Sequence, residues 1–194
     1  MSKPLLIAFL GFPGSGKTHF ATRLAREINA VTFNSDALRL GMFGSLEHIE
    51  EIRRLDNQRL YIDVFGAMDY AAKQTLLAGH SVIYDAQQTK RENRRSVESV
   101  ARSANAVPLL VWIKADPAVA LKRGQEREIR EDSLRYSAEK MKMLIERFDA
   151  VTELPDVSEN VIEINGQDSF ELQHQSFTTQ LDTIVKGIDK TIAI

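Results

Sequence analysis

The residues with the clearest chemical potential form the stretch GFPGSGKT, residues 11–18. Its spacing fits the pattern G-x-x-x-x-G-K-[S/T], in which the glycines let backbone N–H groups turn inward around phosphate oxygens. Lys17 is expected to reach the β- and γ-phosphates of a nucleotide in both binding and catalysis, and Thr18 offers a hydroxyl to Mg²⁺. The stretch lies between an apolar run and a helix start, whose positive end also attracts phosphate. The predicted nucleotide contacts in this loop are Gly11, Pro13, Gly14, Ser15, Gly16, Lys17 and Thr18.

A second polar stretch, FNSDALR at residues 33–39, follows a short apolar run. Parallel strands end at one edge of a sheet, so Asp36 is expected beside the phosphate-binding loop. There its carboxylate can take the proton of an attacking hydroxyl, and Arg39, one helical turn later, can hold an anionic group of the same substrate. The competing interpretation makes Ser35 or Asp36 the N-cap of a helix. If Ser35 is the cap, Asp36 remains available for catalysis.

Two further groups could complete a phosphate site. Asp85 ends the apolar run SVIYD and is predicted to anchor Mg²⁺ together with Thr18, although it could instead begin a turn. Arg123 and Arg127 lie four residues apart on one face of an expected helix, where they can close over the phosphates. Arg130 continues this stripe, but nearby acidic residues could equally make it a solvated surface.

The remaining polar residues carry weaker signals. Arg91, Arg94 and Arg95 follow the aspartate run and could meet a substrate, but a solvated helix face is the simpler interpretation. The four histidines are scattered without the spacing of metal ligands. Neither group is therefore assigned a site.

The elements that position these residues follow from the apolar pattern. Five short apolar runs alternate with longer helical patterns, which is typical of an α/β fold with a five-stranded parallel sheet between layers of helices. The runs cover residues 5–10, 31–34, 81–85, 107–114 and 161–165. Helices are expected over residues 17–29, 35–42, about 47–78, 90–105, 117–130, 137–151 and 168–186, with residues 117–137 forming a helical lid.

Composition restricts the class of protein further. A chain of 194 residues with 43% hydrophobic residues suits one folded domain over residues 1–194. The formal net charge of -2 gives no overall field for nucleic acid or anionic lipid, so any nucleic-acid contact must be local. The chain has no cysteine, and we see neither a signal peptide nor a membrane anchor, so a cytoplasmic protein is expected.

In combination and order, the motifs resemble the P-loop kinases related to zeta toxins and to the kinase domain of phage polynucleotide kinase, a group with an AAA-type ATP-binding domain. The likeness extends over about residues 5–165 and rests on GFPGSGKT, NSDALR, VIYDA and LKRGQER followed by SAEKMKMLIERFD. It implies a three-layer P-loop NTPase fold with strand order 2-3-1-4-5, and ATP with Mg²⁺ as the phosphate donor. It further implies Asp36 as general base, Arg39 as a contact to an acceptor phosphate, and Arg123 and Arg127 as lid arginines.

The same resemblance places the end of the last apolar run beside adenine. Asn165 and Gly166, in VIEINGQD, are the residues it assigns to that position. The hydroxyl acceptor stays open between a polynucleotide 5′-hydroxyl, a nucleoside or sugar derivative, and another small metabolite, and the oligomeric state is open as well.

Two alternatives to a kinase remain. KADP, residues 114–117, partly fits the tetrapeptide with which GTPase switches read guanine, but Ile113 occupies its first position, so ATP is favoured over GTP. An ATP-binding regulator with little kinase activity would use the same phosphate-binding residues.

Overall fold

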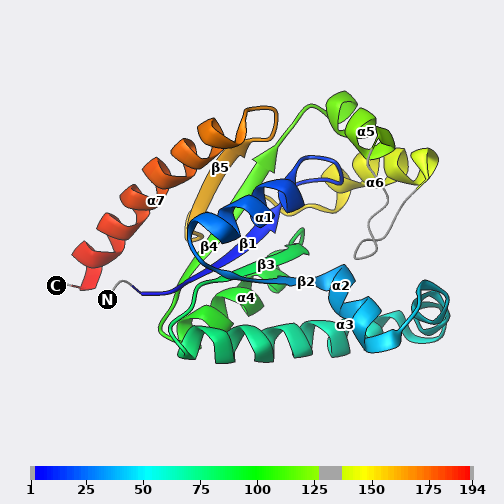
Figure 1. Ribbon diagram of the computed structural model, residues 1–194, viewed down its shortest axis with the longest axis horizontal. Coiled ribbons are helices and arrows are strands. Elements are labelled where there is room, and N and C mark those ends of the chain that lie inside the picture. The colour runs from blue at the N-terminus through cyan, green and yellow to red at the C-terminus, as the bar shows by residue number, and fades with distance from the viewer. Residues whose placement is uncertain (1–2, 127–136, 193–194) are drawn as a thin grey trace.

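The structure is a computed structural model that describes residues 3–126 and 137–192. Its strands form one parallel sheet in the order β2-β3-β1-β4-β5 (Figure 1). The fold class and strand order are therefore as predicted. The strands are β1 (Leu5–Leu10), β2 (Val31–Asn34), β3 (Val82–Gln87), β4 (Val107–Lys114) and β5 (Val161–Asn165).

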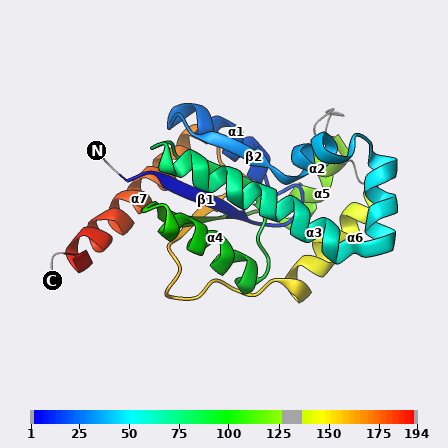
Figure 2. The same ribbon diagram turned by 90° about the horizontal axis from the view of Figure 1, so that it is seen from below.

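Helices cover both faces of this sheet (Figures 1 and 2). On one face, α1 (Lys17–Glu27) and α7 (Phe170–Ile192) pack on a core that contains Ile7 and Phe9. On the other face, α3 (Leu46–Leu77) and α4 (Arg91–Ser103) pack on a core that contains Leu6, Ala8 and Leu10. Both faces of β1 are thus buried, which explains why LLIAFL is apolar without alternation.

The long helix predicted over residues 47–78 contains a kink. Asp56 has φ −152° and ψ 84°, and its carboxylate accepts a hydrogen bond from the backbone N of Arg59 at 2.8 Å. Asp56 therefore caps a second helical segment inside α3, because a side-chain carboxylate can satisfy a free N–H at a helix start. The first segment of α3 packs beside α2 (Ser35–Phe43) at the end of the molecule seen on the right of Figure 1.

The first helix of the predicted lid and the helix that follows the lid lie beside the phosphate-binding loop. α5 (Pro117–Glu126) and α6 (Ala138–Val151) share a small core of Ala120, Met141 and Ile145, against which Phe12 packs. The Phe12 ring also meets Phe148 edge-on, with centroids 5.6 Å apart. The rest of the predicted lid, residues 127–136, lies outside the described residues.

No helix in the described part of the chain combines the length and apolarity needed to cross a membrane.

Candidate active site

The phosphate-binding loop follows β1 and ends at the start of α1, as predicted. Gly14 has φ +82°, a conformation that L side chains rarely adopt, and a Cβ there would collide with the carbonyl O of Ala120. Lys17 starts α1, and its Nζ donates to the carbonyl O of Gly11 at 2.6 Å and of Phe12 at 3.0 Å. The ammonium group therefore lies within the curve of the loop.

A polar atom in the loop suits a phosphate ligand. Ser15 is fully buried, and its Oγ has no hydrogen-bond partner among the described residues. An unsatisfied buried hydroxyl is costly, and a phosphate oxygen would accept its hydrogen bond. With the Lys17 ammonium and the N-terminus of α1 beside it, this loop fits a nucleotide phosphate chain.

Thr18, Asp85 and Asn34 connect the loop to the neighbouring strands. Thr18 Oγ1 lies 3.4 Å from Asp85 Oδ1, and Asn34 Nδ2 donates to Asp85 Oδ2 at 2.7 Å. Asp85 is 6% exposed and pairs with Asn34 in the register of β3 and β2, so the turn-forming alternative for this aspartate is wrong. A hydroxyl beside a carboxylate supplies the hard oxygen atoms that Mg²⁺ prefers.

The described residues contain no group of three or more His, Asp or Glu side chains able to hold a metal without other ligands. Thr18 and Asp85 fit Mg²⁺ better than other metals, because Mg²⁺ usually binds one or two protein oxygens together with phosphate oxygens and waters.

Asn34 has a structural role that sequence reasoning missed. Its Oδ1 accepts from the backbone N of Asp36 at 3.0 Å and of Ala37 at 2.9 Å, so Asn34 is the N-cap of α2. The expectation that Ser35 caps this helix is therefore wrong. Asparagine at the end of a strand is a capping signal in the sequence, but its simultaneous bond to Asp85 depends on strand pairing. Neither capping contact occupies the Asp36 carboxylate.

Asp36 and Arg39 form a pair on α2 at the same edge of the sheet. Arg39 Nη1 donates to Asp36 Oδ1 at 2.8 Å, with side chains 15% and 31% exposed respectively. Burial raises the pKa of the Asp36 carboxyl above its usual value, and the charge of Asp85 raises it further, while Arg39 opposes the rise. The Asp36 carboxyl therefore lies within electrostatic range of Asp85.

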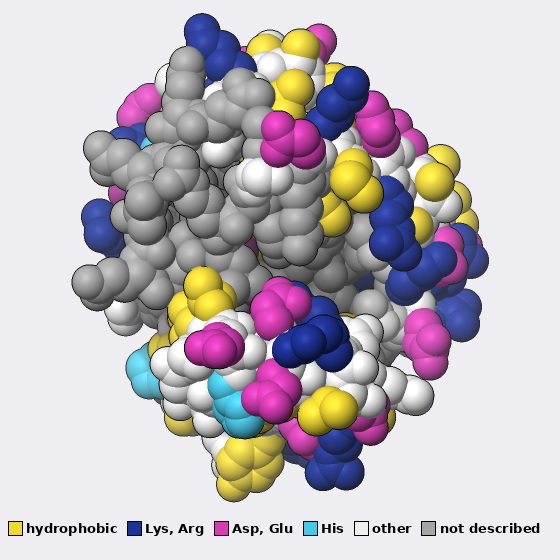
Figure 3. Space-filling model, turned by 90° about the vertical axis from the view of Figure 1, so that its right-hand side faces the viewer, with side chains coloured by type: hydrophobic (Ala, Val, Ile, Leu, Met, Phe, Trp, Pro, Cys, Tyr) yellow, Lys and Arg dark blue, Asp and Glu magenta, His cyan; other side chains and the backbone are white. Residues whose placement is uncertain are grey.

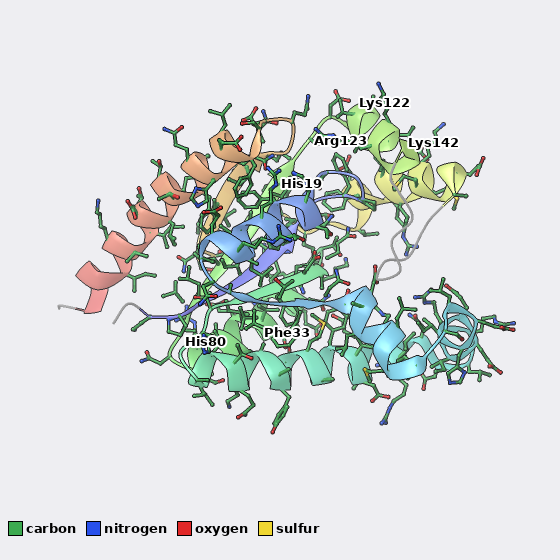
Figure 4. All side chains as sticks on the ribbon, in the orientation of Figure 1. His19, Phe33, His80, Lys122, Arg123 and Lys142 are labelled. Carbon is green, nitrogen blue, oxygen red and sulfur yellow. The ribbon has the colours of Figure 1, made fainter. Side chains whose placement is uncertain are left out.

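Arg123 lies where an adenine contact was predicted. Its Nη1 donates to the carbonyl O of Gly166 at 2.7 Å, joining α5 to the turn after β5. Arg123 and His19 are labelled in Figure 4, and burial, followed by the charges of Arg23 and Arg123, lowers the pKa of His19. Arg127, the second predicted lid arginine, lies outside the described residues, as does Arg130.

Asn165 stabilises the turn after β5 to which Arg123 donates its hydrogen bond. Its Oδ1 accepts from the backbone N of Gln167 at 3.1 Å, and its Nδ2 donates to Asp168 at 2.8 Å. A Cβ on Gly166 would collide with the carbonyl O of Ser15. The turn is therefore pressed against the phosphate-binding loop, and the predicted base-binding pair lies next to that loop.

The arginines after β3 differ from expectation. Arg94 is 5% exposed, and it donates to both carboxylate oxygens of Glu159, at 2.6 and 3.1 Å. It also donates to the carbonyl O of Gln88 and of Leu154. The prediction of a solvated helix face is wrong for Arg94, because this side chain fastens the segment before β5 to the start of α4.

The segment between β3 and α4 contains a further buried polar residue, Gln88, which the sequence did not single out. Gln88 is 1% exposed, its backbone N donates to the carbonyl O of Phe9, and its Oε1 lacks a partner in the described part of the chain. It lies just past β3 at the edge of the sheet that carries the site.

The charged residues of KADP, the tetrapeptide that partly fits a guanine-binding motif, make contacts within the protein. Lys114 ends β4 and pairs with Glu163 at 2.7 Å. Asp116 Oδ1 accepts from the backbone N of Ala118 at 2.7 Å at the start of α5. These contacts explain both charged residues as structural.

The face that carries the ends of α2, α3, α5 and α6 is shown in Figure 3. Acidic side chains lie among the Lys and Arg side chains that are visible there. The described part of this face therefore offers no broad basic surface for a nucleic-acid duplex.

The phosphate-binding loop after β1, the polar residues at the ends of β2 and β3, and the strand order define a P-loop NTPase fold of the kinase type. Residues 6–151 match the family described as the AAA domain, and this chain belongs to that family. The AAA-type part of the resemblance is thus confirmed, whereas a place in the zeta-toxin and polynucleotide-kinase group stays a prediction. No match was found among curated proteins.

Among solved structures, the chain is similar to several kinases. A sugar kinase from Janibacter sp. HTCC2649 is 18% identical, with a TM-score of 0.65 over 94% of this chain and 95% of that chain. A gluconokinase from Sinorhizobium meliloti 1021 is 15% identical, with a TM-score of 0.67 over 98% and 99%. A shikimate kinase from Aquifex aeolicus is 16% identical, with a TM-score of 0.60 over 92% and 97%. At these identities the likeness shows the fold.

Proposed function

We propose that this protein is a phosphotransferase that moves the γ-phosphate of ATP to a hydroxyl group, with Mg²⁺ as cofactor. The observation that carries the proposal is the Asp36 carboxylate. It takes no part in capping α2, it is half-buried, and it lies within electrostatic range of Asp85, whose carboxylate contacts Thr18. A protein that only binds ATP has no need of a second carboxylate at this place.

Each residue has a separate task in the proposed reaction. The loop N–H groups and Lys17 hold the β- and γ-phosphates, while Thr18 and Asp85 would hold Mg²⁺, which neutralises charge on the phosphates when bound. Asp36 accepts the proton of the acceptor hydroxyl as that oxygen bonds to the γ-phosphorus. The bond from the γ-phosphorus to the bridging oxygen breaks, and ADP leaves.

The arginines and the turn after β5 complete the proposal. Arg123, and Arg127 from the rest of the lid, would neutralise charge on the transferring group. Asn165 and Gly166 would border the base of ATP, and Arg39 would hold an anionic group of the acceptor. A closed lid would keep water from the γ-phosphate, which favours transfer over hydrolysis. We further propose a cytoplasmic location, and a nucleic-acid end as one of the open acceptors.

The test is a transfer assay with ATP labelled in its γ-phosphate. Purified protein is incubated with Mg²⁺ and a panel of hydroxyl compounds that includes 5′-hydroxyl oligonucleotides, nucleosides, sugars and gluconate. Labelled product should form with wild type and be lost in Lys17→Ala, because Lys17 meets the phosphates in the ground and transition states. ATP binding without a labelled product from any acceptor would favour the regulator alternative, and tighter binding of GTP than ATP would favour a switch.

A further inference from the structure

Aromatic side chains line one row of α3 beside the proposed acceptor site. Tyr61, Phe65 and Asp69 follow one another at a spacing of four residues, which places them on one side of the helix. The Tyr61 and Phe65 rings are stacked, with centroids 4.3 Å apart and planes 29° apart. Phe65 also stacks on Tyr84, whose hydroxyl donates to Asp69 Oδ1 at 2.6 Å. The row is therefore fixed to β3 at its inner end.

The outer end of this row remains open to solvent. Tyr84 is 1% exposed, whereas Tyr61 is 38% exposed. The fully buried residues of α3 lie in a different row, which contains Leu60, Val64 and Met68, and Phe65 packs partly buried against the same core, whereas Tyr61 does not. Stacking on Phe65 fixes the Tyr61 ring, yet the core does not need it.

The row meets the proposed acceptor residues through Arg39. The Arg39 guanidinium lies 5.9 Å from the centroid of the Phe65 ring, and the same guanidinium donates to Asp36 at 2.8 Å. Arg39 also lies within electrostatic range of the Tyr61 hydroxyl. The Asp36 carboxyl, the Arg39 guanidinium and the rings of Phe65 and Tyr61 are thus joined by successive contacts.

We propose that Tyr61, supported by Phe65, forms the wall of the acceptor site that selects hydroxyl compounds carrying a planar ring. This inference rests on the proposed function, and it adds the kind of acceptor to it. The reactive hydroxyl lies at Asp36, while the planar ring stacks on Tyr61. Stacking suits any planar ring because each presents a π-face, and a saturated sugar without a base lacks that face.

The test compares two ligands that differ by the planar ring. Uridine and D-ribose are titrated calorimetrically into the protein with Mg²⁺ and a saturating non-hydrolysable ATP analogue, so that the ATP site is already filled. Wild type should bind uridine at least tenfold more tightly than D-ribose, and Tyr61→Ala should lose about tenfold in uridine affinity, as expected when a stacking contact is removed. Tyr61→Phe should keep the preference because it keeps the ring.

Tyr70→Ala is the matched control, because Tyr70 is 70% exposed on the same helix and has no place in the row. It should bind uridine as wild type does. Equal affinity for the two ligands, no binding of uridine, an unchanged affinity in Tyr61→Ala, or an equal loss in Tyr61→Phe or Tyr70→Ala would each overturn the proposal.

A transfer assay separates this inference from the proposed function. Phosphate transfer to D-ribose or gluconate at a rate that Tyr61→Ala does not change would overturn the ring site and support the kinase. Uridine binding that depends on Tyr61, together with no transfer to any acceptor, would support the ring site and overturn the kinase.

Discussion

Replacing Asp36 by asparagine tests the proton-transfer step. Asp36→Asn keeps the size of the side chain but removes its capacity to take a proton from the acceptor hydroxyl. Proton transfer by a positioned group typically contributes 10² to 10⁴ in rate, so kcat should fall by about that factor, which is about 3 to 5 kcal/mol in the barrier. ATP affinity should stay close to wild type, because Asp36 lies on α2, outside the phosphate-binding loop.

The structure also sets the size of the stability change. Asn34 caps α2, so neither Asp36→Asn nor Asp36→Ala removes a cap worth about 0.5 to 2 kcal/mol. What both variants lose is the pair with Arg39, and such partly exposed pairs contribute about 0 to 1 kcal/mol. The free energy of unfolding should therefore fall by no more than about 1 kcal/mol, and similarly in the two variants.

Three measurements decide the outcome. Labelled transfer gives kcat with the acceptor identified by the panel, calorimetry gives ATP affinity, and urea unfolding gives stability. Transfer by Asp36→Asn at the wild-type rate would refute the assignment of Asp36 as the base. A stability loss near 2 kcal/mol in Asp36→Ala with little loss in Asp36→Asn would instead show that Asp36 acts as a cap, contrary to the contacts of Asn34.

Further predictions concern pH, capping and burial. Burial raises the pKa of Asp36, and the base must be ionised to act. As the pH is lowered, kcat should therefore begin to fall at a higher pH than it would with an ordinary aspartate. This pH dependence should be absent from the residual activity of Asp36→Asn. Asn34→Ala should lower the free energy of unfolding by about 0.5 to 2 kcal/mol and raise the Mg²⁺ concentration needed for transfer, whereas Ser45→Ala, which removes the cap of α3, should change stability alone. Arg94→Met should lower the free energy of unfolding by up to about 3 to 5 kcal/mol in urea, because the carboxylate of the largely buried Glu159 loses its charged partner. Adding Glu159→Gln should recover part of that loss.

Much of the fold follows from local pattern. The continuous apolar run of β1 predicts a strand covered on both faces, and both cores do contain its side chains. The glycine spacing of the loop predicts its position between β1 and α1. The kink at Asp56 was not predicted, because an aspartate inside a helical pattern is also compatible with an exposed helix position.

Contacts between residues far apart in the chain could not be predicted from the local sequence. Arg94 and Glu159 are 65 residues apart, and nothing near Arg94 in the sequence distinguishes it from Arg91 or Arg95, which are more exposed. The sequence predicts Asn34 at the end of a strand, but its amide reaches Asp85 only because β2 and β3 pair in that register. The site is thus predictable as a set of residue types, while the bonds that orient them depend on the sheet.

The structure gives Gly166 a steric role that is separate from its predicted contact with adenine. The resemblance to P-loop kinases places it beside adenine, a role that a backbone atom can fill whatever the side chain. The structure gives a separate reason for glycine, because a Cβ would collide with the carbonyl O of Ser15 in the phosphate-binding loop. A larger residue at 166 would push the turn away from that loop and displace the carbonyl to which Arg123 donates. Glycine is therefore required at 166 because two backbone segments approach each other closely there. A larger residue would change nucleotide binding by displacing both the phosphate-binding loop and Arg123.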